Sequence, residues 1–261
     1  IGLAKQKFEE YNLQESIYVI GDEQIHHMKV LKEICRKLEM PFADKITHLS
    51  YGMVELTTGK MKSREGTVVD ADDLVSEMTE TAQQHTQELG KVGDFTEEEL
   101  KELYKTLGMG AMKFYLLRVD PKKRMIFNPE DSIDFHGFTG PFVQYTYARI
   151  QSILRKMMDT NLLLEKQFQT TNILPLEKQL ILSLEKYQNV IAQAAGEYNP
   201  SVIANYVFHL SKIFNSFYAE HSVANAESEE KKLLRVCITV MTGNVIKSAT
   251  QLLGIKVPER M

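Results

Sequence analysis

From Asp70 onward, apolar residues recur at the spacing of amphipathic α-helices, and residues that begin or end helices separate the segments. Thr96 and Glu99 have the pattern of a capping box, and Pro141 suits the first turn of a long helix. Three more helices are predicted at 175–195, 200–221 and 228–253. Gly254 ends the last of them. Because so many amphipathic helices have to bury their apolar faces against one another, we predict a mainly α fold organised around a helical bundle.

The first 56 residues carry a different pattern, in which strand and helix signals alternate. Residues 16–20 form a β-branched and aromatic run that ends at a turn, and 48–56 is a second apolar run. Between them, apolar residues recur at helical spacing as far as Leu38, and Pro41 closes that helix. This order is that of a parallel α/β sheet with too few strands to be complete. We predict three parts: a partial α/β, Rossmann-type segment over 1–93, a helical connecting region over 94–135 and a helical domain over 136–261.

Composition narrows the class of protein. With 43% hydrophobic residues among 261, the chain can bury a core without disulfides. Its two cysteines, Cys35 and Cys237, lie far apart and outside any metal-binding spacing, which favours a reducing compartment and no metal site. No apolar run is long enough to span a bilayer, so we expect a cytoplasmic protein without a membrane partner. Because the net charge is −4, any contact with RNA has to come from a local basic patch.

The strongest chemical signal is a loop with three cationic side chains, Lys60, Lys62 and Arg64, flanked by Gly59 and Gly66. Glycine lets such a loop move, and the cations can neutralise a polyphosphate. On charge alone the loop can equally be a solvated basic surface.

A second signal lies where the first strand ends and a helix begins, at Gln24 and His27. Open α/β sheets bind ligands at such strand ends. From the residues alone, His27 is more simply a helix histidine making one hydrogen bond, and Gly52, Met53 and Val54 are simply part of a buried strand.

A third signal is aromatic. Tyr145 and Arg149 are four residues apart and share one helix face, and Tyr206 lies on a later predicted helix. Aromatic rings stack on unpaired bases, and arginine binds phosphate or stacks on a base. The alternative is that these rings belong to the core.

Together these segments resemble arginyl-tRNA synthetases. The loop resembles the KMSKS signature of class I aminoacyl-tRNA synthetases, and Lys60, Met61 and Arg64 fit it. Ser63 stands where most class I enzymes have a second lysine, a departure that is common in arginyl enzymes. The resemblance implies that Lys60, Lys62 and Arg64 are catalytic and that the loop closes over ATP as the adenylate forms.

The resemblance also implies roles for the other residues. Gln24 would contact arginine, His27 the nucleotide, and the backbone of Gly52, Met53 and Val54 the adenine. The segment from Phe135 to Ile150 resembles the start of the family's anticodon-binding domain. The tail from Leu252 to Met261 resembles the family's end. The residues implied to bind tRNA are Tyr145, Arg149, Tyr206 and Met261.

The family joins arginine to its tRNA through arginyl-adenylate, at the expense of ATP with Mg²⁺. The resemblance therefore implies arginine tRNA, ATP and L-arginine as partners, no DNA, no tightly bound cofactor and a monomer. The chain carries no HIGH signature, the other class I motif, and it opens at Ile1-Gly2 without methionine. We expect a fragment that covers about the second half of the family's length, ends at the family's C-terminus and is inactive alone.

Three alternatives stay open. A cysteinyl enzyme has a similar helical bundle, although the Lys-Ser-Arg-Glu-Gly-Thr-Val loop and the Glu-Arg-Met end favour the arginyl family. A noncatalytic RNA-binding or protein-interaction module could be built from the same parts. A helical scaffold without an RNA role would make the signature loop a coincidence.

Overall fold

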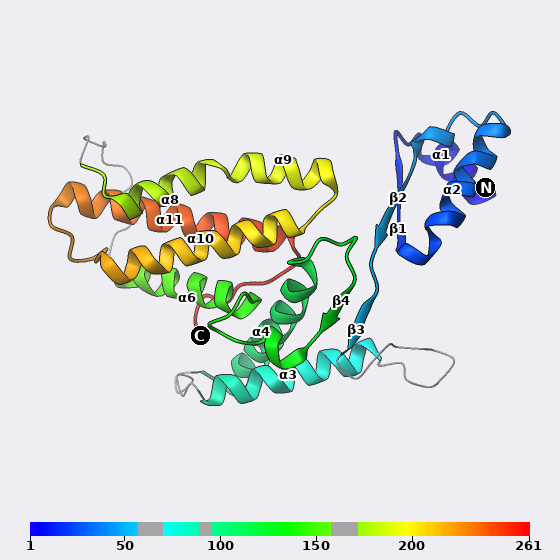
Figure 1. Ribbon diagram of the computed structural model, residues 1–261. Coiled ribbons are helices and arrows are strands. Elements are labelled where there is room, and N and C mark those ends of the chain that lie inside the picture. Colours follow the sequence, from blue (N-terminus) through cyan, green and yellow to red (C-terminus); the bar gives the residue numbers. More distant parts are fainter. Residues whose placement is uncertain (57–69, 89–94, 158–171) are drawn as a thin grey trace. The chain divides into compact units, whose positions relative to one another are not determined.

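The computed structural model describes residues 1–56, 70–88, 95–157 and 172–261, which Figure 1 draws in colour. The chain forms two compact units, one of residues 1–59 with 119–126 and the other of 60–118 with 127–261. The three-part division expected from the sequence stays a prediction. Among the described residues, no helix is both long and apolar enough to cross a membrane.

The first unit contains the predicted strand–helix–strand segment. Its elements before residue 52 are α1 (Gly2–Tyr11), β1 (Ser16–Gly21), α2 (Ile25–Lys37) and β2 (Ile46–Tyr51). The two strands are parallel, in a register that runs from Ser16 opposite Ile46 to Gly21 opposite Tyr51. A small core joins them to the helices, with Cys35 fully buried and Phe8 stacked on Phe42 at 5.0 Å between ring centroids. The partial parallel α/β segment is therefore confirmed.

Two local features of this unit differ from the sequence prediction. The helix α1 was not predicted. The helix α2 ends at Lys37, because Glu39 adopts a left-handed conformation with φ of 52° and the chain turns there. Pro41 lies beyond that turn, so naming it as the residue that closes the helix was wrong.

The first unit also includes a second, short pair of strands. The strand β3 (Val54–Leu56) pairs with β4 (Met125–Phe127), whose last residue belongs to the second unit. Residues 119–126 therefore return to the end of β2. This is the strand end that is predicted from the sequence to bind adenine.

The second unit is helical. Its elements are α3 (Ala71–Glu88), α4 (Glu97–Leu117), α5 (Pro129–Ser132), α6 (Gly140–Lys156), α8 (Pro175–Glu185), α9 (Tyr187–Glu197), α10 (Ser201–Glu220) and α11 (Glu229–Leu252). The helices α6, α8, α10 and α11 pack on one another around one core, while α3 packs on α4 and α4 on α6 (Figure 1). Fully buried side chains such as Phe114, Ile150 and Phe214 fill this core. The mainly α fold with a helical bundle is confirmed.

Local signals in the sequence account for most helix ends. The capping box of Thr96 and Glu99 opens α4 as predicted, and Asp70 caps α3 by accepting from the backbone N–H of Asp72. The predicted helix over 175–195 is instead two helices, α8 and α9, which meet at Lys186. Gly254 ends α11 with φ of 67°, as the sequence predicted.

A close helix crossing joins α4 to α6. A Cβ atom on Gly140 would overlap the backbone carbonyl of Gly110, and a Cβ on Gly110 would overlap the side chain of Gln144. Glycine at 140 allows the two backbones to approach this closely, and glycine at 110 leaves room for the Gln144 side chain. This crossing fixes how α6 lies on α4.

Candidate functional site

Three of the four residues predicted to bind tRNA line one open pocket of about 210 Å³ in the second unit. Tyr145 and Arg149 come from α6, and Met261 comes from the tail that follows α11. Tyr218 of α10 closes another side. The other lining residues are Ala148, Ser152, Ile153, Arg155, Lys156 and Arg260.

The periodicity of α6 explains why these side chains meet. Tyr145, Arg149, Ser152 and Lys156 are spaced by four, three and four residues, so they share one face of the helix. The buried residues of α6, such as Ile150, pack into the bundle core. One face of α6 therefore anchors the helix while another lines the pocket.

The Arg149 guanidinium is oriented by side chains from two helices. Its Nη1 donates to Oδ1 of Asn215 at 2.5 Å, and the Nδ2 of Asn215 donates to Oγ1 of Thr146 at 2.9 Å. The guanidinium carbon lies 4.8 Å from the ring centroid of Tyr145 and 5.7 Å from that of Tyr218. Such cation–π contacts hold a planar cation beside aromatic faces, an arrangement suited to a flat base.

The tail reaches the pocket by a defined path. Gly254 and Ile255 donate to the carbonyls of Gln251 and Thr250, the pair of hydrogen bonds that turns a chain away from a helix end. Arg155 Nη1 then donates to the carbonyl of Glu259 at 3.0 Å. These contacts bring Met261 to the pocket.

The next residue back, Arg260, ties the tail to the start of α4. It forms an ion pair with Glu99 and lies 4.3 Å from the ring centroid of Phe95. The hydrogen bond from the Thr96 backbone, followed by the charge of Arg260, lowers the pKa of Glu99. Glu99 therefore serves both the helix cap and the tail.

The pocket is the kind of local basic patch that a chain with net charge −4 needs for RNA binding. Four cationic side chains line it: Arg149, Arg155, Lys156 and Arg260. No acidic residue is among its lining residues. An anionic, flat ligand fits this combination of cations and rings.

Tyr206 does not line this pocket. Its ring stacks on Tyr187 at 5.6 Å between centroids, and its hydroxyl donates to the carbonyl of Ser183 at 2.9 Å. Burial, followed by the nearby Tyr187, raises the pKa of Tyr206 to about 12. These contacts are those of a tyrosine that braces α10 against α8 and α9.

The predicted nucleotide-binding residues lie in the first unit. Gln24 and His27 are exposed where β1 passes into α2. Gly52 packs tightly under residues 123 and 124, because a Cβ atom there would overlap the backbone of Lys123. The N–H of Gly52 donates to the carbonyl of Pro121 at 2.7 Å, and the carbonyl of Met53 accepts from Met125 at 3.1 Å. Two of this segment's backbone groups are thus bonded within the protein.

The catalytic residues implied by the signature loop, Lys60, Lys62 and Arg64, lie outside the described residues. Within the described ranges, no three His, Cys, Asp or Glu side chains gather as metal ligands would.

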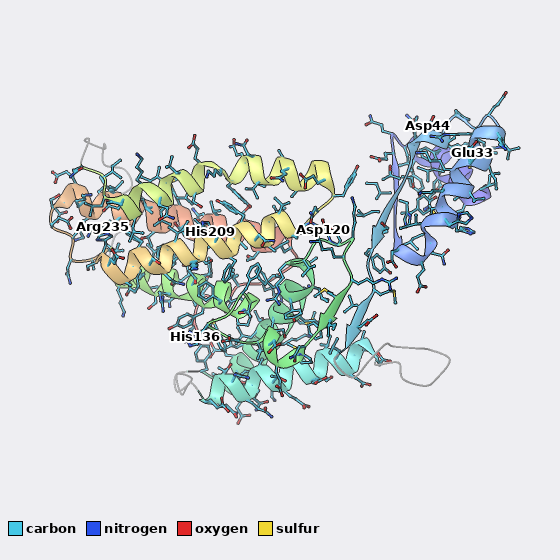
Figure 2. All side chains as sticks on the ribbon, viewed as in Figure 1. Glu33, Asp44, Asp120, His136, His209 and Arg235 are labelled. Carbon is cyan, nitrogen blue, oxygen red and sulfur yellow. The ribbon has the colours of Figure 1, made fainter. Side chains whose placement is uncertain are left out.

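Two features of these sites were missed from the sequence. The return of residues 119–126 to the strand end had only one local signal, the turn at Asp120-Pro121, where Asp120 is labelled in Figure 2. The orienting role of Asn215 had none, because its partner Arg149 lies 66 residues away in sequence.

Two family models match the chain. Residues 1–128 match the catalytic domain of class I tRNA synthetases of the arginine type, described as "tRNA synthetases class I (R), catalytic domain". Residues 143–261 match the "DALR anticodon binding domain". The pocket lies wholly within the second match.

Curated relatives cover the whole chain. It is 51% identical over 263 residues to the arginine–tRNA ligase of Flavobacterium psychrophilum, a match that takes in 100% of this chain and 43% of that protein. It is 46% identical to the arginine–tRNA ligase of Amoebophilus asiaticus, over 100% of this chain and 44% of that protein. The chain therefore spans less than half the length of these relatives.

Solved structures share the fold. The arginyl-tRNA synthetase of Thermus thermophilus matches with a TM-score of 0.79 and 27% identity, over 95% of this chain and 41% of that one. The arginyl-tRNA synthetase of Plasmodium falciparum matches with a TM-score of 0.77 over 99% of this chain and 43% of that one. At 21% identity the second match shows the fold alone.

Proposed function

The chain belongs to the arginyl-tRNA synthetase family, and on that premise we propose that its second unit binds the anticodon of arginine tRNA through the pocket of α6, α10 and the tail. The observation that carries this proposal is the arrangement around Arg149. A planar cation, fixed by Asn215, lies beside the rings of Tyr145 and Tyr218, and Met261 lines the same pocket.

An unstacked base fits this arrangement better than a duplex does. A base can stack on a tyrosine ring while Arg149 pairs with a base edge or with the adjoining phosphate. Single-stranded loops present bases in this way, and an anticodon is such a loop. Tyr206 is not included among the RNA contacts, because its ring and hydroxyl are bonded within the protein.

The test is binding of the 261-residue chain to arginine tRNA and to the same tRNA altered at the middle anticodon base, across a salt series. We expect tighter binding of the unaltered tRNA, and loss of that preference in Tyr145→Ala. Equal binding of both tRNAs with a steep salt dependence would show phosphate contacts without base recognition and would contradict the proposal.

The first unit and the signature loop would serve the chemistry of the whole protein. We propose that this protein joins arginine to its tRNA through arginyl-adenylate, with ATP and Mg²⁺ as substrate and no tightly bound cofactor. Gln24 would contact arginine and His27 the nucleotide. Adenine would bind along the strand end of Gly52, Met53 and Val54, and the bonds at Gly52 N–H and Met53 carbonyl leave other backbone groups for it.

Lys60, Lys62 and Arg64 would stabilise the charge that builds up on pyrophosphate during activation. In the whole protein, Lys60→Ala should slow adenylate formation, while Tyr145→Ala should mainly weaken tRNA binding. Swapped kinetic effects would contradict this division between the two units.

We further propose that the 261-residue chain does not catalyse either step alone. Arginine-dependent exchange of pyrophosphate into ATP measures the first step directly. Exchange above background by this chain would contradict the proposal. A cytoplasmic location and a monomeric state stay predictions.

A further inference from the structure

One buried side chain connects the helix that carries Tyr145 and Arg149 to the tail that carries Met261. Gln144 of α6 is fully buried, and its Nε2 donates to the carbonyl of Lys256 at 2.8 Å and to that of Thr106 at 3.0 Å. It thus joins α6, α4 and the tail at one point. We propose that Gln144 is a positioning residue for the tRNA pocket, setting where the tail places Met261; this rests on the proposed function.

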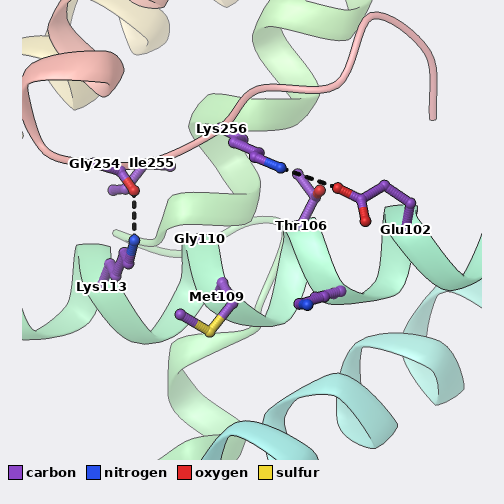
Figure 3. A pocket seen from close by; sticks show the side chains of 9 residues that line it. Glu102, Thr106, Met109, Gly110, Lys113, Gly254, Ile255 and Lys256 are labelled. Carbon is purple, nitrogen blue, oxygen red and sulfur yellow. Dashed lines mark hydrogen bonds and ion pairs between the residues drawn. The ribbon is translucent and has the colours of Figure 1, made fainter.

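Ile255 of the tail packs in the bundle core, while the other side-chain hydrogen bonds and ion pairs of the tail are at the surface. Figure 3 shows two of them: Lys113 donates to the carbonyl of Gly254 at 2.7 Å, and Lys256 pairs with Glu102 at 3.1 Å. The side chains of Lys256 and Glu102 are 79% and 62% exposed. Exposed pairs of this kind contribute little, because water competes for both partners.

Gln144 differs from these contacts because its own side chain is fully buried. A buried amide that loses its acceptor stays unsatisfied, so the bond to Lys256 favours one placement of the tail. The geometry of its neighbours holds the carboxamide in place. Gly110 lies directly against it, and any side chain at position 110 would overlap it.

The orientation of the Gln144 carboxamide decides which of its atoms bonds to the tail. The Oε1 atom is buried with no hydrogen-bond partner, while both hydrogen bonds come from Nε2. With the amide reversed, an oxygen would face two carbonyl oxygens. The side chain therefore acts as a donor only, toward one carbonyl on α4 and one on the tail.

From Lys256 to the pocket the tail has only five further residues, so a shift at Lys256 moves Met261. Gln144 and Tyr145 are neighbours in sequence but point to different sides of α6, one toward α4 and the other into the pocket. Gln144 does not line the pocket and has no place among the RNA contacts.

The test uses Gln144→Met, which keeps the length of the side chain and removes both hydrogen bonds. In the full-length protein, we expect discrimination between arginine tRNA and the tRNA altered at the middle anticodon base to fall about fivefold, the worth of one net hydrogen bond. Combining Gln144→Met with Met261→Ala should lower it no further than Met261→Ala alone, because both act through the same tail. Losses that multiply, or unchanged discrimination in Gln144→Met, would overturn the inference.

A matched control separates positioning from loss of stability. Val207→Ala removes buried volume from α10 without removing either hydrogen bond of Gln144, and should leave discrimination unchanged. Amide hydrogen exchange over residues 255–261 should become faster in Gln144→Met and stay the same in Val207→Ala. Equally fast exchange in both variants would mean that Gln144 only supports general stability.

Measurements on the unaltered protein and on Tyr145→Ala distinguish failure of the proposed anticodon site from failure of the role proposed for Gln144. If the unaltered protein does not discriminate, the proposed anticodon site fails and this inference fails with it. If it discriminates and Tyr145→Ala abolishes the preference while Gln144→Met does not change it, only the role of Gln144 is wrong.

Discussion

Arg149 shows how a single side chain in this pocket depends on its shape as well as its charge. Asn215 accepts a hydrogen bond from its guanidinium, which lies near the rings of Tyr145 and Tyr218. Arg149→Lys keeps the positive charge but loses the planar fork, so tRNA affinity should fall about tenfold, the worth of a lost stacking contact. Binding titrations at several salt concentrations measure this, and the slope of log K against log salt should not change.

Two comparisons test that argument. Arg149→Gln removes the charge as well, so its salt slope should become shallower by about 0.7 for one phosphate contact to a single strand. Lys178→Gln removes an exposed charge on α8, outside the pocket, and should change neither affinity nor slope. If Arg149→Lys binds tRNA as tightly as the unaltered chain, the guanidinium acts only as a point charge.

The sequence could predict part of this pocket, for a physical reason. Tyr145 and Arg149 lie one helical turn apart, so their shared face follows from local spacing. Their partners Asn215 and Tyr218 come from α10, and only the packing of α10 on α6 brings them near. Tyr206 has the same residue type and a similar setting in the sequence, yet its ring stacks on Tyr187 and its hydroxyl donates to Ser183.

At the scale of elements, a buried ion cluster fastens α8 to α11. Glu177 is fully buried, and its carboxylate accepts from Lys231 at 2.5 Å and from Arg235 at 2.9 Å. Arg235, labelled in Figure 2, also pairs with Glu227 at 2.8 Å. Burial acts to raise the pKa of Glu177, but hydrogen bonds from Lys231, the Leu174 backbone and Arg235 together lower it below its ordinary value.

This cluster should give stability a specific dependence on pH. Folding lowers the pKa of Glu177 from its value of 4.5 in the unfolded chain. Glu177 therefore stabilises the folded chain at pH values above 4.5, and this contribution is lost as the pH falls through the pKa of the folded chain. Glu177→Gln should cost about 3–5 kcal/mol at neutral pH, since two cations stay buried without their carboxylate. Urea unfolding of both proteins should show the difference shrinking below pH 4.5. A difference that stays constant with pH, or an equal effect of Glu220→Gln at an exposed site, would contradict this.

The crossing of α4 and α6 offers a second test between elements. Gly140→Ala places a methyl group against the backbone carbonyl of Gly110, which cannot move aside, so we expect a loss of about 1–3 kcal/mol. Gly196→Ala in α9 meets nothing within 4 Å and should instead gain about 0.5–1 kcal/mol of helix propensity. Thermal unfolding of the two variants should therefore shift in opposite directions, and a shift in the same direction would refute the crossing as described.

Helix ends were largely predictable because they are set by contacts within a few residues. Thr96 with Glu99, Asp70, and Gly254 are all local signals, and each lies at a helix end in the structure. The crossing at Gly140 was not predictable, because its partner Gly110 lies on another helix. The division of 175–195 at Lys186 likewise has no glycine or proline to mark it.

For the whole molecule, net charge −4 sets a limit on how the chain can bind tRNA. An acidic body repels the phosphate backbone, so attraction has to come from places where cations gather. In the second unit the pocket is such a place, with Arg149, Arg155, Lys156 and Arg260. Arg260 already pairs with Glu99, which leaves its charge partly neutralised.

This limit predicts the salt dependence of binding. If four cations at most replace counterions on single-stranded phosphates, the slope of log K against log salt should be no steeper than about −3. Titration of arginine tRNA between low and physiological salt measures the slope, with Lys178→Gln as the charge control outside the pocket. A much steeper slope would show that a second basic surface carries the tRNA, and Lys60→Ala and Lys123→Ala would then locate it. A slope near −3 that becomes shallower in Arg155→Gln would mean that one pocket on an acidic chain supplies both the attraction and the recognition of the anticodon.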